Sequence, residues 1–255
     1  MGKERAKMNK YKFIDSFNLK LIAIIAMTVD HTGALFFKGA NIWLYLFMRT
    51  VGAVTFPVMA FMITQGFLYT KNFNKYALRL FLFSLASMIP YAFAFGKSTY
   101  GLNVGFTLLL GLFAVKAYED ISNRILKWAA VFFLAVLSFK CDWGFTGVFL
   151  IVFLHIAGEN KKNIILAMCG GILMFVLKNQ AALFIEKGRF FSFAAITGSV
   201  AFLRLAGFFI SACLIFLYNK EKGRDIKQLF YIYYPAHLFV LALIRYAPAI
   251  MKHIL

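Results

Sequence analysis

Long apolar segments recur along this 255-residue chain and are joined by short polar links. Hydrophobic residues make up 62% of the sequence, whereas a soluble domain averages about 45–50%. The segments do not alternate polar and apolar residues as the strands of an outer-membrane barrel do. A helix satisfies its own backbone hydrogen bonds in lipid. The chain is therefore predicted to be all-α, a polytopic bundle of transmembrane helices.

Nine apolar segments are predicted to span the membrane, and an amphipathic or re-entrant piece near 180–190 would raise the number to ten. The predicted spans are residues 19–37, 42–69, 78–96, 102–117, 125–139, 144–157, 163–178, 192–218 and 228–250. Residues 1–18 are predicted to be a basic cytoplasmic segment, and residues 19–255 a single membrane domain. No small-residue cleavage pattern follows the first apolar run, so we expect that run to be retained rather than removed as a signal peptide.

The basic residues predict the orientation. With a cytoplasmic N-terminus, 18 of the 28 Lys and Arg residues fall on the inner side and seven on the outer side, while Arg49, Arg204 and Arg245 fall within spans. By the positive-inside rule this distribution predicts an N-terminus in the cytoplasm and a C-terminus outside, in a bacterial cytoplasmic membrane. The net charge of +18 is therefore interpreted first as a topology signal, and second as a source of attraction to anionic lipid. No nucleic-acid partner is expected.

Several familiar kinds of site have no pattern in this sequence. The three cysteines and four histidines are too dispersed for a disulfide framework or a metal site, so no metal is expected. No phosphate-binding loop of an ATP-driven pump is present. The four prolines, which are expected to break or bend spans, do not occupy matching places in two halves, as inverted-repeat transporters would favour. They are Pro57, Pro90, Pro235 and Pro248.

An acid and a histidine occur side by side in the first predicted span. A charge at membrane depth is costly, so Asp30 and His31 are functional candidates by default. A link of about four residues joins this span to the next, which carries Arg49, and at ~1.5 Å per residue all three lie ~10 Å below the outer surface. Neighbouring helix positions point in different directions. We therefore expect Asp30 to hold an arginine while His31 faces a cavity.

Further candidates lie in the later spans and links. Arg204 and Arg245 are expected in the outer half of the membrane, and His237 nearer the midplane. Arg204 is open to a structural role such as pairing with Asp30, and Arg245 to reaching the interface with its long side chain. Asp142 either caps the helix that follows or belongs to the site.

These residue types suit two kinds of protein. Histidine is a natural general base near neutral pH, and arginine binds phosphate or stabilises developing negative charge. Transfer of an acyl group across a membrane needs both. A proton-coupled or small-molecule transporter could use the same residues, and a membrane assembly factor without enzymatic activity is a third possibility.

A family resemblance favours the first kind. The stretch 19–33, which ends in Asp30-His31-Thr-Gly33, resembles the opening of the TraX family, membrane proteins named for the acetylase of conjugative F-type pilin. The resemblance continues over nearly the whole chain and in order. It includes Arg49 to Phe67, Tyr76-Ala-Leu-Arg-Leu80, Leu102-Asn103, Asp142-Trp-Gly-Phe-Thr-Gly147 and Phe230 to Leu238.

The resemblance implies an acetyltransferase of the transmembrane acyltransferase class. It would take acetyl from cytosolic acetyl-CoA and pass it to an amine or hydroxyl of an acceptor near the outer face. That acceptor could be a pilin N-terminus, another peptide or a glycan. His31 becomes the expected catalytic residue, with Asp30 beside it. The residues expected to bind substrate or cofactor are Arg49, Arg79, Asn103, Asp142, Arg204, His237 and Arg245.

Overall fold

The computed structural model describes residues 12–96, 101–187, 200–224 and 227–254. Every regular element in these ranges is a helix, and two isolated backbone bridges are the only strand-like pairings among them. The all-α prediction is confirmed for this part of the chain. Side chains are not described at 179–187, 200–204, 227–229 and 248–254.

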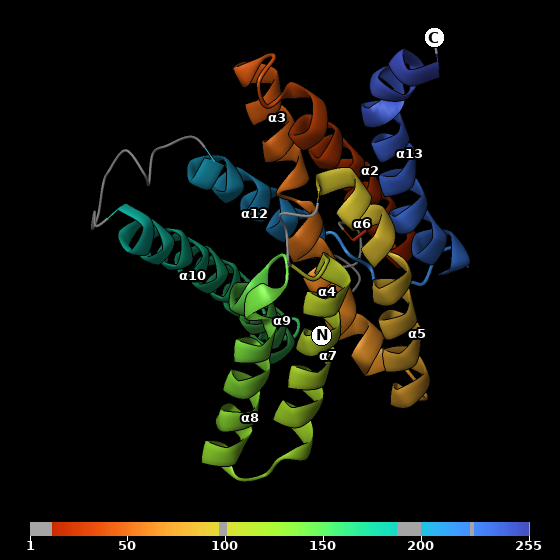
Figure 1. Cartoon of the computed structure of the whole chain (residues 1–255). Helices are drawn as coiled ribbons and strands as arrows, with labels where there is room; N and C mark the ends of the chain where they lie inside the picture. Colours follow the sequence, from red (N-terminus) through yellow and green to blue (C-terminus); the bar gives the residue numbers. More distant parts are fainter. Residues whose placement is uncertain (1–11, 97–100, 188–199, 225–226, 255) are drawn as a thin grey trace.

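The helices follow the predicted segments closely. Most predicted segments coincide with one helix, and the first three coincide with two consecutive helices each (Figure 1). In chain order the elements are α2 Ser16–Thr32, the π-helix η1 Gly33–Phe37, α3 Ile42–Gly52, α4 Thr55–Tyr69, α5 Phe73–Ala86, α6 Met88–Phe95, α7 Val104–Asp120, α8 Arg124–Leu137, the 3₁₀ turn η2 Ser138–Lys140, α9 Gly144–Ala157, α10 Lys161–Lys187, α12 Val200–Phe216 and α13 Lys227–Ile254.

Three helical stretches within the described residues are long and apolar enough to cross a membrane. They are Ser16–Phe37, Ile42–Tyr69 and Phe73–Phe95. Gly144–Ala157 and Leu205–Phe216 are apolar but shorter. These stretches indicate a membrane protein, while the nine-span arrangement and the orientation stay predictions. A separate piece near 180–190 is not seen as far as residue 187, because α10 continues unbroken to that residue, and residues 188–190 lie outside the described part of the chain.

Two of the prolines explain where long segments are divided. Proline lacks a backbone N–H, and its ring collides with the carbonyl four residues earlier. Four residues before Pro57 lies Ala53, where α3 has just ended, and four residues before Pro90 lies Ala86, the last residue of α5. By contrast, α13 continues unbroken through Pro235 and Pro248.

Asparagine side chains fix the starts of several helices, α3, α5, α7 and α8 among them. Asn41, Asn72, Asn103 and Asn123 each accept a hydrogen bond from a backbone N–H in the first turn of the helix that follows, at 2.9–3.0 Å. These bonds satisfy donors that have no partner within the helix. The short polar links therefore set where α3, α5, α7 and α8 begin.

The core consists of two apolar clusters. The larger one includes the fully buried side chains of α4, α7 and α9, such as Val58, Leu112 and Ile151. The smaller one joins α2, α6 and α13, which lie together in Figure 1. Phe83 and Val104 pack against both clusters, and both also line a cavity. The cavity therefore lies at the junction of the two clusters.

Candidate functional site

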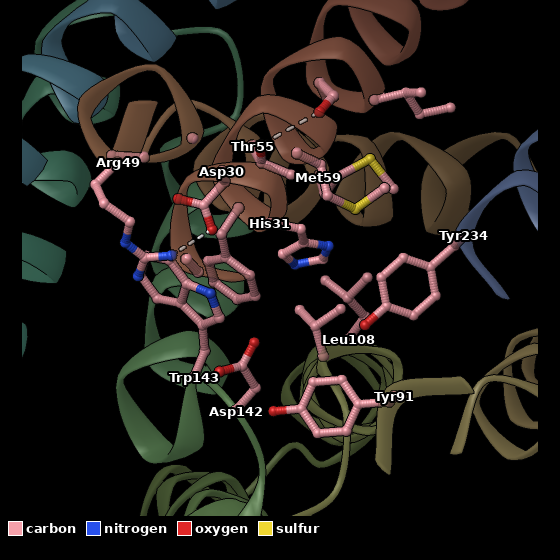
Figure 2. Close-up of a pocket in the computed structure, with 18 of the residues that line it drawn as sticks. Asp30, His31, Arg49, Thr55, Met59, Tyr91, Leu108, Asp142, Trp143 and Tyr234 are labelled. Carbon is pink, nitrogen blue, oxygen red and sulfur yellow. Dashed lines mark hydrogen bonds and ion pairs between the residues drawn. The ribbon is translucent and has the colours of Figure 1, made fainter. Parts of the chain in front are cut away.

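A cavity of about 550 Å³ opens between the two halves of the core. Its walls come from α2, α3, α4, α5, α6, α7, α10 and α13, together with the link before α9. Figure 2 shows Asp30 and His31 on one side of this space and Asp142 and Tyr91 on the other. Polar side chains from distant parts of the sequence thus meet inside a largely apolar lining.

Asp30 and Arg49 form an ion pair at the cavity wall. Arg49 Nη1 lies 2.7 Å from Asp30 Oδ2, and both side chains are about four-fifths buried, at 20% and 19% exposure. The pair forms because α2 and α3 pack as neighbours, and because Gly52 has no side chain where Asp30 lies. The expectation that an arginine would pair with Asp30 is confirmed, and the arginine is Arg49.

His31 lies one residue further along α2 and has a different partner. Its Nδ1 is 2.9 Å from Nε2 of His237 on α13, and the two rings are nearly parallel, with 5.1 Å between centroids and 5° between planes. The edge of Phe95 packs against His31 at 5.3 Å. His31 lines the cavity, whereas His237 is not among the lining residues. The two histidines, 206 residues apart, therefore form one unit.

Backbone hydrogen bonds in the link before α9 hold Asp142 at the cavity. The Asp142 N–H donates to the carbonyl of Leu102 at 3.0 Å, and the Leu102 N–H donates to the carbonyl of Lys140 at 2.9 Å. Helix α9 begins at Gly144, whose φ of +56° suits glycine, and its N-cap residue is Trp143 without a side-chain cap. Asp142 therefore does not occupy the N-cap position of this helix, and it belongs to the cavity lining.

Three other predicted site residues, all with described side chains, do not line the cavity, and a fourth lies outside the described side chains. Asn103 is fully buried, where its side chain caps α7 and donates to the Ser84 carbonyl at 2.7 Å. Arg245 donates to the carbonyl of Ala94 at 2.7 Å and so ties α13 to α6. Arg79 lies over the Tyr76 ring on α5. Arg204 belongs to α12, at a position outside the described side chains.

The structure thus brings Asp30, His31, Arg49 and Asp142 to one cavity, with His237 in contact. Their catalytic and binding roles stay predictions. No group of three or more His, Cys, Asp and Glu suited to a metal ion occurs among the residues that the structure describes.

Several lining residues had not been singled out from the sequence. They are Lys38, Tyr45, Tyr91, Trp143, Lys178 and Tyr234. A helical signal existed for two of them, because Tyr234 lies three residues before His237 on α13 and Tyr45 lies four residues before Arg49 on α3, in each case on the same helix face. The others reach the cavity through long-range packing, for which a single sequence carries no signal.

Comparison with known proteins gives two matches. A family model described as TraX protein matches residues 16–245 of the chain. The probable fimbrial assembly protein FimC, serogroup H1, of Dichelobacter nodosus is 28% identical over 239 residues, covering 89% of this chain and 93% of that protein. No solved structure matches the chain significantly.

Proposed function

The chain belongs to the TraX family, and from that membership and the geometry of the cavity we propose that it is a membrane-embedded acetyltransferase. It transfers acetyl from acetyl-CoA to an amine or hydroxyl of an acceptor near the outer face of the cytoplasmic membrane. The observation that carries the proposal is an imidazole, His31, on the wall of a cavity that also contains a paired arginine.

The cavity residues suit the steps of acyl transfer. His31 is the general base that removes the proton of the attacking amine or hydroxyl. Arg49 keeps further N–H groups besides the one bonded to Asp30, and these can stabilise the oxyanion that forms on the acetyl carbonyl. Asp30 holds the guanidinium in place. Asp142 and Tyr91 lie on the facing wall, and their proposed role is to orient the acceptor.

The donor is proposed to enter from the cytoplasmic side, where acetyl-CoA is made. Phe83 and Ile24 line the cavity, and Arg79 and Lys20 lie four residues before them on α5 and α2. Residues four apart share a helix face. The two cations thus lie one helical turn from the cavity lining, where phosphates of the donor could bind.

The size of the cavity and the name of the similar protein both bear on the class of acceptor. A cavity of about 550 Å³ holds a chain terminus or one sugar unit rather than a folded protein. The named relative is a probable fimbrial assembly protein. A pilin N-terminus is therefore the first acceptor to test, with other peptides and glycans as the alternatives.

The test uses the purified full chain in detergent and in proteoliposomes, with acetyl-CoA labelled in the acetyl group. We expect slow hydrolysis alone and faster transfer when an acceptor peptide is added. His31→Ala should lose at least about 10²-fold in turnover. His155→Ala is the matched control, because His155 bonds Glu119 outside the cavity.

Two outcomes would contradict the proposal. Full turnover in His31→Ala would show that His31 is not the general base. Solute flux in proteoliposomes without any use of acetyl-CoA would instead indicate a transporter.

A further inference from the structure

The hydrogen-bond partners of His237 determine where its proton lies. Its Nδ1 is 3.1 Å from the backbone carbonyl of Tyr233, one turn earlier on α13. A carbonyl oxygen can only accept, so Nδ1 of His237 must carry the hydrogen. A neutral imidazole has one N–H and one lone pair, and Nε2 of neutral His237 is therefore an acceptor.

The same reasoning then determines the tautomer of His31. The His237 Nε2 acceptor lies 2.9 Å from His31 Nδ1, so His31 Nδ1 is the donor of that bond. With its hydrogen on Nδ1, neutral His31 has its lone pair on Nε2. Both rings lie among apolar and aromatic side chains, including Phe95 and Tyr234, where an unpaired charge is costly. Such surroundings favour the neutral pair at rest.

A second contact holds the two helices in this register. The Tyr233 hydroxyl is 2.8 Å from Oγ1 of Thr28, which itself donates to the carbonyl of Ile24 at 2.9 Å. Thr28 precedes His31 by three residues, and Tyr233 precedes His237 by four, so both contacts join the same two helix faces. The Tyr233 ring also stacks on His237 at 5.2 Å. The orientation of the His237 imidazole is therefore fixed both by its bond to the Tyr233 carbonyl and by the stacked Tyr233 ring.

We propose that His237 is a positioning residue that sets the tautomer of His31 and shares its proton during acyl transfer. This inference rests on the proposed function. His31 Nε2 takes the proton of the acceptor while the His31 Nδ1 proton moves to His237 Nε2. The acceptor N–C or O–C bond to acetyl forms and the C–S bond of acetyl-CoA breaks. The leaving thiolate takes a proton from His31 Nε2, and His237 returns its proton to His31 Nδ1.

The proposal distinguishes two substitutions at one position. In His237→Gln the side-chain amide oxygen can still accept from His31 Nδ1, whereas in His237→Phe nothing can. We expect His237→Phe to lower kcat by about 10²-fold, the loss of a well-placed base, with the KM for acetyl-CoA and acceptor unchanged. His237→Gln should recover at least about tenfold of that loss.

The direct readout is the tautomer, measured by ¹⁵N NMR on histidine-labelled full chain in detergent, with the His31 signal assigned by its loss in His31→Ala. We expect His31 to carry its hydrogen on Nδ1 in the native protein and in His237→Gln. It should shift towards the Nε2–H form, which an unconstrained imidazole favours, in His237→Phe. A His155→Phe variant should leave the His31 tautomer unchanged.

Failure of this inference and failure of the proposed function can be told apart. The NMR measurement needs no substrate, so a native protein with His31 Nδ1–H but without acetyl-CoA activity would overturn only the enzymatic role. A native protein with His31 Nε2–H would overturn the inference even if the enzyme is active. Equal kcat in His237→Phe and His237→Gln would do the same.

Discussion

Replacing Gly52 with alanine should separate two helices at the site. A Cβ at position 52 would lie 2.1 Å from Asp30 Oδ1 and 2.2 Å from Asp30 Cβ. Carbon atoms in contact are about 3.5–4.0 Å apart. Because the Asp30 Cβ is attached directly to the α2 backbone, no side-chain rotation relieves the clash. The helices α2 and α3 must therefore move apart by at least about 1 Å.

That movement would also break the ion pair. The Arg49–Asp30 bond measures 2.7 Å, and an added ~1 Å takes it beyond the range of a hydrogen bond. Overpacking costs about 1–3 kcal/mol, and a hydrogen bond to a charged group contributes about 1.5–3 kcal/mol. The free energy of unfolding should fall by about 3–5 kcal/mol. At roughly 2–4 °C per kcal/mol the Tm should fall by about 10 °C.

The assay is thermal unfolding of the purified full chain in detergent, with Gly39→Ala as the matched control. Gly39 lies in the link between the same two helices, and a Cβ there would meet nothing within 4 Å. We expect Gly39→Ala to unfold at the native Tm. If Gly52→Ala also kept the native Tm, the close approach of α2 and α3 would not be what positions Asp30.

Four further changes test other parts of the structure. Arg49→Gln should destabilise by about 3–5 kcal/mol because it removes the cation paired with a largely buried carboxylate. Adding Asp30→Asn should restore much of the Tm, and no restoration would mean that the two side chains are not coupled. Arg245→Met should lower the Tm by a few degrees by removing the donor to the Ala94 carbonyl; a raised KM with native Tm would indicate a binding role instead. Arg79→Gln should raise the KM for acetyl-CoA about tenfold without changing kcat, as expected for a lost phosphate contact. The control variant Arg124→Gln should keep the native KM. Equal KM values in the two variants would show that Arg79 does not bind the donor. Cysteines placed at positions 162 and 187 should be labelled from opposite sides of the membrane, and labelling of both from one side would contradict the nine-span prediction.

The sequence predicted the helices well because each is a long apolar run closed by a polar link. It also predicted that Asp30, His31 and Arg49 would meet, since a link of about four residues forces two helices to run antiparallel at matching depth. Counting residues placed His237 deeper than His31, although the two rings are in contact. Such a count assumes that every helix crosses straight and starts at one level, which packing does not require.

The rest of the site depends on contacts that no local pattern encodes. Lys178 lies on α10 and Tyr91 on α6, and neither position differs in sequence from other polar residues near a helix end. Asn103 and Arg245 show the opposite case. Arg245 was a site candidate because it is charged within an apolar segment, and Asn103 because the family resemblance includes it. Each is bonded to a backbone carbonyl, and neither lines the cavity. A buried polar side chain must find a partner, and the backbone is the most abundant one.

The adjacency of Asp30 and His31 has a structural consequence. Successive residues of a helix point about 100° apart, so the acid and the imidazole cannot share a partner on one neighbouring helix. Asp30 therefore bonds Arg49 on α3, while His31 bonds His237 on α13. In the Ser-His-Asp triad a carboxylate sets the histidine tautomer. Here the adjacent carboxylate is engaged by an arginine, so that a second imidazole, itself fixed by the Tyr233 carbonyl, is the group in place to orient the base.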